Sequence, residues 1–509
     1  MNKLLPYIFL FCFSPCFSQT LATQPNAVEA VLKKAGKNRP ELEKAISYFQ
    51  KSKDPLKLKA IQFLVSNMDI HFSQDYYWAD STGKRIAFNE LQYPNLAESV
   101  HAFNELKSSV RGIHPVSFSY RDLDTIKADF LIENVERAFT AWKQSPTKNI
   151  PFNYFCEYIL PYRVTTEPLQ NWRPLYQEQF KWIADSAAKG GFLTAMGYAS
   201  EDYKSWFTSS WGTEQGKEPL PNQGPLQLLF RKKGLCQDIA GLEVFTLRSQ
   251  GIPSSFNFIP QWATTASRHF LNTVFDPQMQ AIPLDVSRTP ALDNKLQREP
   301  SKVFRVTYSK QPATLASFHD GQNIPNGFMR MQNYIDITKD YWPVADVNCK
   351  LFPTSITPQV AYACVFSGGQ WRPVWWGKTL NRSVNFSAMC KGAVFMPAYY
   401  KNGRLMPAGY PVASGYNNQQ VLQPDTLNKR TITIYEQEKY LVLRPGKRYK
   451  LLYWDNNWKA AGEKTAEEDA LSLVFDNVPA NALYLLVPEY SQKMERPFMI
   501  TPDGKRVWW

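Results

Sequence analysis

Apolar residues recur at three- and four-residue intervals through the first part of the chain. The strings PELEKAISYFQ (residues 40–50), PLKLKAIQFLVSNM (55–68) and ADFLIENVERAFTAW (128–142) have this spacing. The first two begin with Pro, which is favoured in the first turn of a helix. Such spacing gives a helix one apolar face for packing against other helices. We therefore expect a mainly helical region over residues 19–149.

The pattern changes between residues 150 and 234, where Pro, Trp and Gly interrupt the periodicity. The most distinctive string is FCEYILPYRVTTEPLQNWR (155–173). Its four charged residues either pair with one another or line a cleft, and pairing is the preferred interpretation. These residues are Glu157, Arg163, Glu167 and Arg173.

Short β-branched and aromatic runs dominate after about residue 340, among them QVAYACVF (359–366), QWRPVWW (370–376) and GAVFMPAYY (392–400). A second block contains TITIY (431–435), YLVLRPG (440–446), KRYKLLYW (447–454) and FMITPDGKRVWW (498–509). Asn402-Gly403 and Asp503-Gly504 are typical of tight hairpin turns. We expect two consecutive β-sandwich-like modules, residues 336–425 and 426–509, with most of their aromatic side chains in the sandwich cores.

The first eighteen residues, MNKLLPYIFLFCFSPCFS, combine an early Lys3, an apolar run and small residues before Gln19. This pattern predicts a secretory signal peptide over residues 1–18. Lipid attachment at Cys16 is the less favoured alternative, because Pro15 precedes it. The signal peptide leads us to expect a secreted, periplasmic or cell-surface protein. No other run is long enough for a transmembrane segment, so none is expected.

Composition supports a globular, multidomain protein, with 509 residues, 44% hydrophobic and 20% charged. Removal of Lys3 with the signal peptide changes the formal charge from +13 to +12. The basic residues are dispersed and form no nucleic-acid-binding motif, so we expect no nucleic-acid partner. Five cysteines remain, with no C-x-x-C spacing, so neither a structural zinc site nor another cofactor is expected. This odd number leaves at least one thiol unpaired.

The segment KKGLCQDIAGLEVFTLRSQGIPSSFNFIP (232–260) places a cysteine at the start of a helix. Gly234 permits a close backbone approach just before Cys236, and the apolar residues that follow predict a largely buried helix. The positive end of a helix dipole favours a negatively charged sulfur. Gly251-Ile252-Pro253 ends the helix and begins a strand, SSFNFIP.

The downstream string SRHFLNTVFDPQMQAIPLDVS (267–287) predicts a strand, a turn and a second strand. With residues 276–279 as the turn, His269 lies opposite Asp285, so both side chains point to the same face. Asp276 is the competing carboxylate. Its position beside Pro277 is better explained by turn formation, so Asp285 is preferred.

Together these residues suit nucleophilic catalysis. Cys236 is the candidate nucleophile, His269 the base, and Asp285 the group that orients the imidazole. The backbone N–H of Cys236 is a candidate donor to an oxyanion. Three side chains upstream are alternatives for a second donor: Trp211, Gln223 and Gln227.

The pattern G-x-C-x-D with A-x-L, then R-x-x-G-I-P, then a His and an Asn on one strand, then an Asp, resembles the transglutaminase-like superfamily. The match covers about residues 234–285, and Leu271 stands where the family usually has an aromatic residue. The resemblance implies a papain-like α+β core over residues 150–335 and acyl-transfer chemistry. A helical N-terminal region, an LPYR string and β modules ending in a Trp pair are also similar to large secreted bacterial transglutaminase-domain proteins.

Three functions follow from this resemblance and from the residues. The leading hypothesis is a thiol amidase or peptidase that hydrolyses an amide bond in a peptide, peptidoglycan or glycoprotein. The second is a cross-linking transglutaminase, in which a Lys amine replaces water. The third is a catalytically silent surface protein whose aromatic β modules contact a glycan or a protein.

Overall fold

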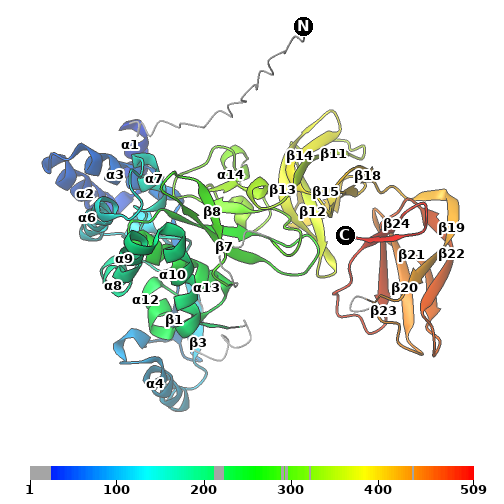
Figure 1. Cartoon of the computed structure of the whole chain (residues 1–509), viewed down its shortest axis with the longest axis horizontal. Coiled ribbons are helices and arrows are strands. Elements are labelled where there is room, and N and C mark those ends of the chain that lie inside the picture. The colour runs from blue at the N-terminus through cyan, green and yellow to red at the C-terminus, as the bar shows by residue number, and fades with distance from the viewer. Residues whose placement is uncertain (1–24, 211–222, 288–291, 293–295, 320–322, 438–440) are drawn as a thin grey trace, which may run out of the picture.

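The computed structural model describes residues 25–210, 223–287, 292, 296–319, 323–437 and 441–509. The expected signal peptide lies outside these residues. The chain is a mixed helix-and-sheet protein, with helices concentrated in its first half and strands in its second (Figure 1).

Helices packed on one another form the N-terminal part, and the periodic strings all lie in them. The main helices are α1 (Pro25–Lys34), α2 (Arg39–Lys51), α3 (Pro55–Asn67), α6 (Ala128–Gln144) and α7 (Phe152–Tyr158). The Asp54 side chain begins α3 by accepting the backbone N–H groups of Leu56 and Lys57. Their buried apolar faces form one continuous cluster, which also includes Tyr308.

A small antiparallel sheet interrupts these helices, which the apolar spacing did not predict. It contains β1 (Phe72–Ala79), β2 (Arg85–Ile86) and β3 (His114–Arg121), in the order β2-β1-β3. Helix α4 (Leu96–Ser109) lies beside this sheet in a projecting lobe (Figure 1). Tight turns and one-turn helices complete this half: η1 (Gly36–Asn38), η2 (Met68–Ile70), η3 (Glu90–Gln92) and α5 (Asp122–Thr125).

Residues 150–234, where Pro, Trp and Gly interrupt the apolar periodicity, are mostly helical. They contain α8 (Arg173–Gln179), α9 (Lys181–Gly190), α10 (Phe192–Trp206), α12 (Pro225–Arg231) and the short strands β4 (Thr208–Ser209) and β5 (Lys233–Gly234). Helix α13 (Cys236–Ser249) follows, as predicted, and is buried from Ile239 to its end.

Helix α13 packs against a five-stranded antiparallel sheet of order β10-β9-β6-β7-β8. The strands are β6 (Ser254–Ile259), β7 (His269–Phe275), β8 (Ala281–Leu284), β9 (Phe304–Val306) and β10 (Tyr334–Asp336). The strand predicted for SSFNFIP is therefore confirmed as β6. The connections also contain α14 (Leu315–Phe318), η5 (Phe328–Arg330) and η6 (Thr338–Asp340).

An eight-stranded antiparallel sheet follows, of order β11-β14-β13-β12-β15-β17-β18, with β16 paired to β15. Its strands are β11 (Val344–Lys350), β12 (Val360–Ser367), β13 (Gln370–Leu380), β14 (Ser383–Cys390), β15 (Ala393–Lys401), β16 (Arg404–Pro407), β17 (Val412–Ser414) and β18 (Gln419–Val421). Asn402-Gly403 connects β15 to β16 with positive φ at both residues, as predicted for this hairpin.

The C-terminal strands form a pair, β19 with β22, and a five-stranded sheet of order β21-β20-β23-β24-β25. They are β19 (Asp425–Tyr435), β20 (Arg448–Asp455), β21 (Asn457–Thr465), β22 (Ser472–Ala480), β23 (Tyr484–Pro488), β24 (Phe498–Ile500) and β25 (Arg506–Trp508). Asp503-Gly504 lies in the β24–β25 hairpin, as predicted. The β-like run YLVLRPG forms no strand within its described residues, only a bridge at Leu441.

Aromatic side chains and one buried lysine join these parts. Trp371 lies 5.3 Å from Trp454 between ring centroids, so the eight-stranded sheet packs on the C-terminal strands. Lys302 is fully buried and donates from Nζ to Asp336 Oδ2 at 2.5 Å and to the carbonyl oxygens of Ser387 and Ala388 at 2.7 and 2.9 Å. The five-stranded sheet is thereby tied to the eight-stranded one.

The tryptophans of QWRPVWW are only partly exposed, and their indole N–H groups are inaccessible to solvent. They pack into three of the apolar clusters, so these aromatic rings are core residues. Among the described residues, no helix is both long and apolar enough to cross a bilayer.

Candidate active site

The start of α13 is shaped by a glycine and a capping aspartate. The Oδ2 atom of Asp238 accepts the backbone N–H of Leu235 at 2.8 Å, so its side chain folds back over the start of the helix. A Cβ atom on Gly234 would lie 2.5 Å from the Cβ of Asp238. Glycine is therefore required there, and Asp238 has a structural role as the capping residue of this helix. Cys236 is left at the first position of the helix and is partly exposed.

Two buried polar side chains hold α13 in place. The Nδ2 atom of Asn272, on β7, donates to the carbonyl oxygen of Ala240 at 2.8 Å. Near the other end of the helix, Nη1 of Arg248 donates to the carbonyl oxygen of Arg163 at 2.9 Å. The N-terminal half of α13 is therefore tied to the strand that begins at His269.

His269 is the first residue of β7, and its Nε2 atom lies 2.7 Å from Oδ2 of Asp285, just beyond the end of β8. The other carboxylate oxygen, Oδ1, accepts the N–H and the Oγ–H of Ser287, at 3.1 and 2.6 Å. The carboxylate is thus fixed from both sides. The structure brings together the predicted base and its predicted orienting group.

The predicted hairpin register was wrong by two positions. Phe275 pairs with Ala281 and Asn272 with Leu284, so continuing this register places Asp285 opposite Leu271 rather than His269. Side chains alternate along a strand with a period of two, so a two-residue error leaves His269 and Asp285 on the same face. Diagonal neighbours remain within reach of each other.

The electrostatic environment favours a charged pair. Burial alone would lower the pKa of His269, but hydrogen bonds with Asp285 and with the Cys236 sulfur, and the negative charges of both groups, raise this pKa to about 9. Burial alone would raise the pKa of Asp285, but its hydrogen bond to the imidazole and the contacts with Ser287 lower it. Since Nε2 is committed to Asp285, Nδ1 is the ring nitrogen left for the sulfur of Cys236.

A tryptophan from outside the predicted motif packs on the imidazole. Trp262 stacks on His269, with ring centroids 5.8 Å apart and planes inclined by 23°. Leu271 is buried in the same cluster as Trp262. Trp262 lies in the loop between β6 and β7, where no hydrophobic periodicity marks it. An aromatic ring therefore contacts His269 although Leu271 occupies the position expected for one.

The loop that carries Trp262 is itself held by Gln261. Its Nε2 atom donates to the carbonyl oxygens of Thr265 and Ser267, at 2.9 and 2.8 Å, and lies 2.8 Å from Oγ of Ser367. Ser367 ends β12 in the eight-stranded sheet. The position of the His269 ring thus depends in part on a residue about one hundred positions downstream.

Cys236 differs from the other cysteines that the structure describes. Cys156, Cys349, Cys364 and Cys390 are buried thiols, and none is in a disulfide. Burial raises the pKa of each of these four thiols, which makes them poor nucleophiles. Cys236 is the accessible thiol of the described chain.

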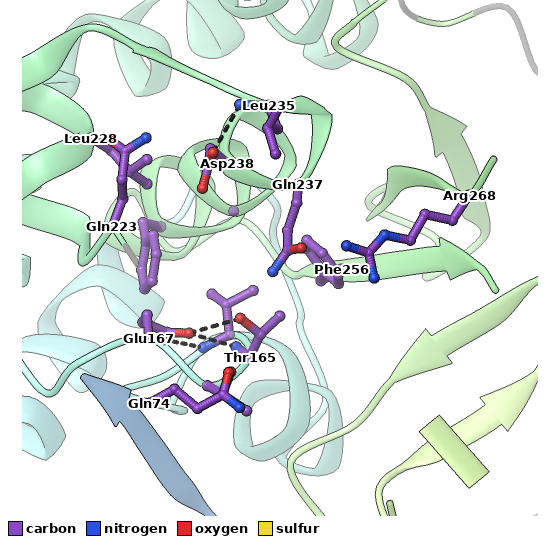
Figure 2. Close-up of a pocket in the computed structure, with 14 residues that line it drawn as sticks. Gln74, Thr165, Glu167, Gln223, Leu228, Leu235, Gln237, Asp238, Phe256 and Arg268 are labelled. Carbon is purple, nitrogen blue, oxygen red and sulfur yellow. Dashed lines mark hydrogen bonds between the residues drawn. The ribbon is translucent and has the colours of Figure 1, made fainter. Parts of the chain in front are cut away.

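A polar pocket of about 220 Å³ lies at the start of α13, lined by residues next to Cys236 and His269 in the chain rather than by these two themselves (Figure 2). Leu235 and Gln237, the two neighbours of Cys236, line it, as does Arg268, the neighbour of His269. The facing wall comes from the loop at Thr165 and from Gln74 of β1 (Figure 2). Neither Arg268 nor Gln74 was a candidate from the sequence, because neither belongs to a motif.

The four charged residues of FCEYILPYRVTTEPLQNWR do not pair with one another, so that preferred interpretation was wrong. Arg163 forms a buried ion pair with Asp122, at 2.5 Å between Nη2 and Oδ1. Glu157 accepts hydrogen bonds from Ser309, and Arg173 donates to carbonyl oxygens at the end of α7. Only Glu167 reaches the pocket, which agrees with the cleft alternative for that residue alone.

The other sequence candidates have structural contacts or lie outside the described residues. Asp276 Oδ1 accepts the N–H groups of Gln278 and Gln280, so its assignment to turn formation is confirmed. Gln223 donates through Nε2 to the carbonyl oxygen of Lys233 at 2.9 Å, and Gln227 accepts from Gln170. Trp211 is outside the described residues. The second oxyanion donor stays unassigned.

Within the described ranges, no group of three or more His, Cys, Asp and Glu side chains is arranged to hold a metal ion. A scan against models of known protein families finds no match, and a search of curated proteins finds no significant match either.

Proposed function

We propose that the chain is a secreted, thiol-dependent acyl-transfer enzyme of the transglutaminase-like kind, which hydrolyses an amide bond in a peptide, peptidoglycan or glycoprotein. Cys236 would be the nucleophile, His269 the acid and base, and Asp285 the orienting carboxylate. The proposal includes a papain-like core over residues 150–335 and two β-sandwich-like modules after it.

One observation carries the proposal: the partly buried imidazole of His269 has Asp285 at 2.7 Å on one nitrogen and the Cys236 thiol as its other hydrogen-bonding neighbour. A structural histidine needs no accessible thiol beside it. Here the thiol lies at a helix N-terminus, where the dipole favours negative sulfur. A polar pocket adjoins it, as a substrate would need.

The reaction that this arrangement supports has two halves. The Cys236 sulfur attacks the amide carbonyl carbon, an S–C bond forms, and the C–N bond breaks as the His269 imidazolium protonates the leaving amine. A water then attacks the thioester while His269 takes its proton. The C–S bond breaks, a carboxylic acid leaves, and Cys236 returns to its starting state. Asp285 keeps the ring oriented and stabilises its charge throughout.

Thiol alkylation tests the nucleophile. Iodoacetamide should modify Cys236 of the mature protein rapidly near pH 7.5 while the four buried cysteines stay unmodified, as mass spectrometry of the peptides would show. The His269→Ala variant should react more slowly, by about tenfold or more, since its thiol lacks the imidazolium partner. Asp276→Asn is the matched control, because it changes a carboxylate of the same hairpin that does not contact the imidazole.

Substrate profiling tests the reaction. Amide cleavage in peptide or peptidoglycan libraries should disappear in Cys236→Ala and be detected as a new amine. Incorporation of a labelled amine in place of water would favour transglutaminase activity instead. A Cys236 that reacts only after denaturation would overturn the enzymatic proposal.

A further inference from the structure

The pocket beside Cys236 contains an imbalance of charge. Two carboxylates line it, but both are already committed to the protein: Glu167 accepts from the N–H groups of Val164 and Thr165, each at 2.7 Å, and Asp238 caps α13. These hydrogen bonds stabilise both carboxylates in their present positions. The carboxylates contribute shape to the pocket more than an attraction for cations.

The cation that lines the pocket is not committed in this way. Arg268 is exposed and has no carboxylate partner among the described residues. Its guanidinium lies over the ring of Phe270, 5.7 Å from the centroid, and Figure 2 shows it directed toward Gln237 and Phe256. A guanidinium supported by an aromatic ring and open to a pocket is a typical carboxylate-binding group.

Amide groups extend this donor surface. The side chain of Gln237 makes no hydrogen bond to another described residue, so its amide is available to a ligand. The Oε1 atom of Gln74 accepts from Thr166 Oγ1 at 3.2 Å, which leaves its Nε2 group to donate. The pocket therefore offers several N–H donors around a space into which a negatively charged oxygen would fit.

The size of the pocket limits what it holds. Its volume of about 220 Å³ is below the ~300–1,000 Å³ of sites that enclose a drug-sized ligand. It suits one amino-acid-sized group of a longer substrate. Because Arg268 and Gln237 are the chain neighbours of His269 and Cys236, that group must lie close to the scissile amide.

We infer that this pocket is a subsite for a carboxylate of the substrate, which Arg268 binds together with the side-chain amides of Gln237 and Gln74. The inference rests on the proposed function, because it assigns to the same site a preference for anionic peptides cleaved next to a carboxylate. That carboxylate belongs either to an acidic side chain or to a chain terminus, which share the same chemistry.

Two alkylating reagents separate this inference from the reactivity of the thiol itself. Iodoacetate and iodoacetamide form the same S–C bond and release the same iodide, but only iodoacetate carries a carboxylate. The ratio of their rates at Cys236 should fall about fivefold in Arg268→Gln, which corresponds to ~1 kcal/mol for a partly solvated ion pair. The control Lys232→Gln removes an equal charge four residues before Cys236 but outside the pocket lining, and should leave the ratio unchanged.

The outcomes are distinguishable. An unchanged ratio in Arg268→Gln with rapid iodoacetamide reaction would overturn the subsite and leave the proposed enzyme standing. Slow reaction with both reagents in the unaltered protein would instead count against the proposed function. In that case the subsite is tested separately, by ligand protection in Cys236→Ala. Millimolar N-acetylglutamate should slow the modification of Arg268 by phenylglyoxal at least threefold, and an absence of protection would reject the subsite.

Peptide substrates distinguish the two sources of the carboxylate. One peptide carries a Glu side chain with an amidated C-terminus, a second carries Gln with a free C-terminus, and a third carries Gln with an amidated C-terminus. Binding to Cys236→Ala should be weakest for the third. The stronger of the first two identifies the source, and equal binding of all three contradicts the inference.

Discussion

Replacing Asp285 with Asn removes the charge beside His269 while keeping the size of the side chain. The folded pKa of His269, about 9, lies well above its ordinary value of 6.5. Each tenfold change in a protonation equilibrium is worth ~1.4 kcal/mol, so the protonated ring is favoured by ~3 kcal/mol. Asp285 supplies the strongest part of this preference, against the opposing effect of burial. We expect the His269 pKa in Asp285→Asn to fall below about 7.

The functional consequence is a loss of imidazolium. At pH 8 a group with a pKa of about 9 is roughly nine-tenths protonated, whereas a group with a pKa near 6.5 is protonated only to a few hundredths. Any step that needs the protonated ring should slow about thirtyfold. The raised pKa also links to folding: its contribution to the free energy of unfolding is fully present below pH 6.5 and disappears as the pH rises through about 9.

The direct assay is an NMR titration of protein labelled with ¹³C at the histidine ring. The chain has only five histidines, so the His269 signal can be assigned from a His269→Gln variant. Asp276→Asn, in which the amide oxygen can still accept the turn hydrogen bonds, should leave the titration unchanged. If His269 titrates at the same pH in the unaltered protein and in Asp285→Asn, the carboxylate does not hold the ring proton and the reasoning fails.

Three further predictions concern the helix and loop around the site. Gly234→Ala should lower the free energy of unfolding by ~1–3 kcal/mol in urea, because its Cβ would displace Asp238, whereas Gly241→Ala meets no atom within 4 Å and should stabilise the same helix by ~0.5–1 kcal/mol. Burial raises the pKa of Glu243 to about 7, so its carboxylate destabilises the folded protein at high pH. The stability of Glu243→Gln should equal that of the unaltered protein at pH 4.5 and exceed it by up to ~3 kcal/mol at pH 8. Equal stability of the two proteins at both pH values would contradict this. Gln261→Ala should speed hydrogen exchange of residues 260–269 about tenfold, the equivalent of ~1.4 kcal/mol, and unaltered exchange would show that the loop does not depend on it.

The site was most predictable where local rules act. A glycine before a cysteine and an aspartate two residues after it describe one capped helix start, and the structure shows how Asp238 closes over Gly234. The prediction that His269 contacts Asp285 was right although the predicted register was wrong by two positions. Side chains alternate between the two faces of a sheet, so an error of two leaves them on the same face. That error arose at the turn. The turn was predicted over residues 276–279, but the connection covers residues 276–280, because Phe275 pairs with Ala281.

Contacts between segments far apart in the sequence could not be predicted from the pattern of apolar and polar residues. Trp262 lies in a loop without periodicity, and nothing in its neighbours indicates that it stacks on His269. Gln74, which lines the wall facing Gln237, precedes it by more than 150 positions. Helices α8 to α10 were missed because Pro, Gly and Trp break the apolar spacing, although tertiary packing stabilises those helices.

The buried amine of Lys302 restricts how the molecule can move. Moving the eight-stranded sheet away from the five-stranded one would remove two carbonyl acceptors from Nζ at once and leave Asp336 as its hydrogen-bond partner. The loss of these two hydrogen bonds to a charged donor opposes separation of the sheets. The two parts should therefore tumble in solution as a single body.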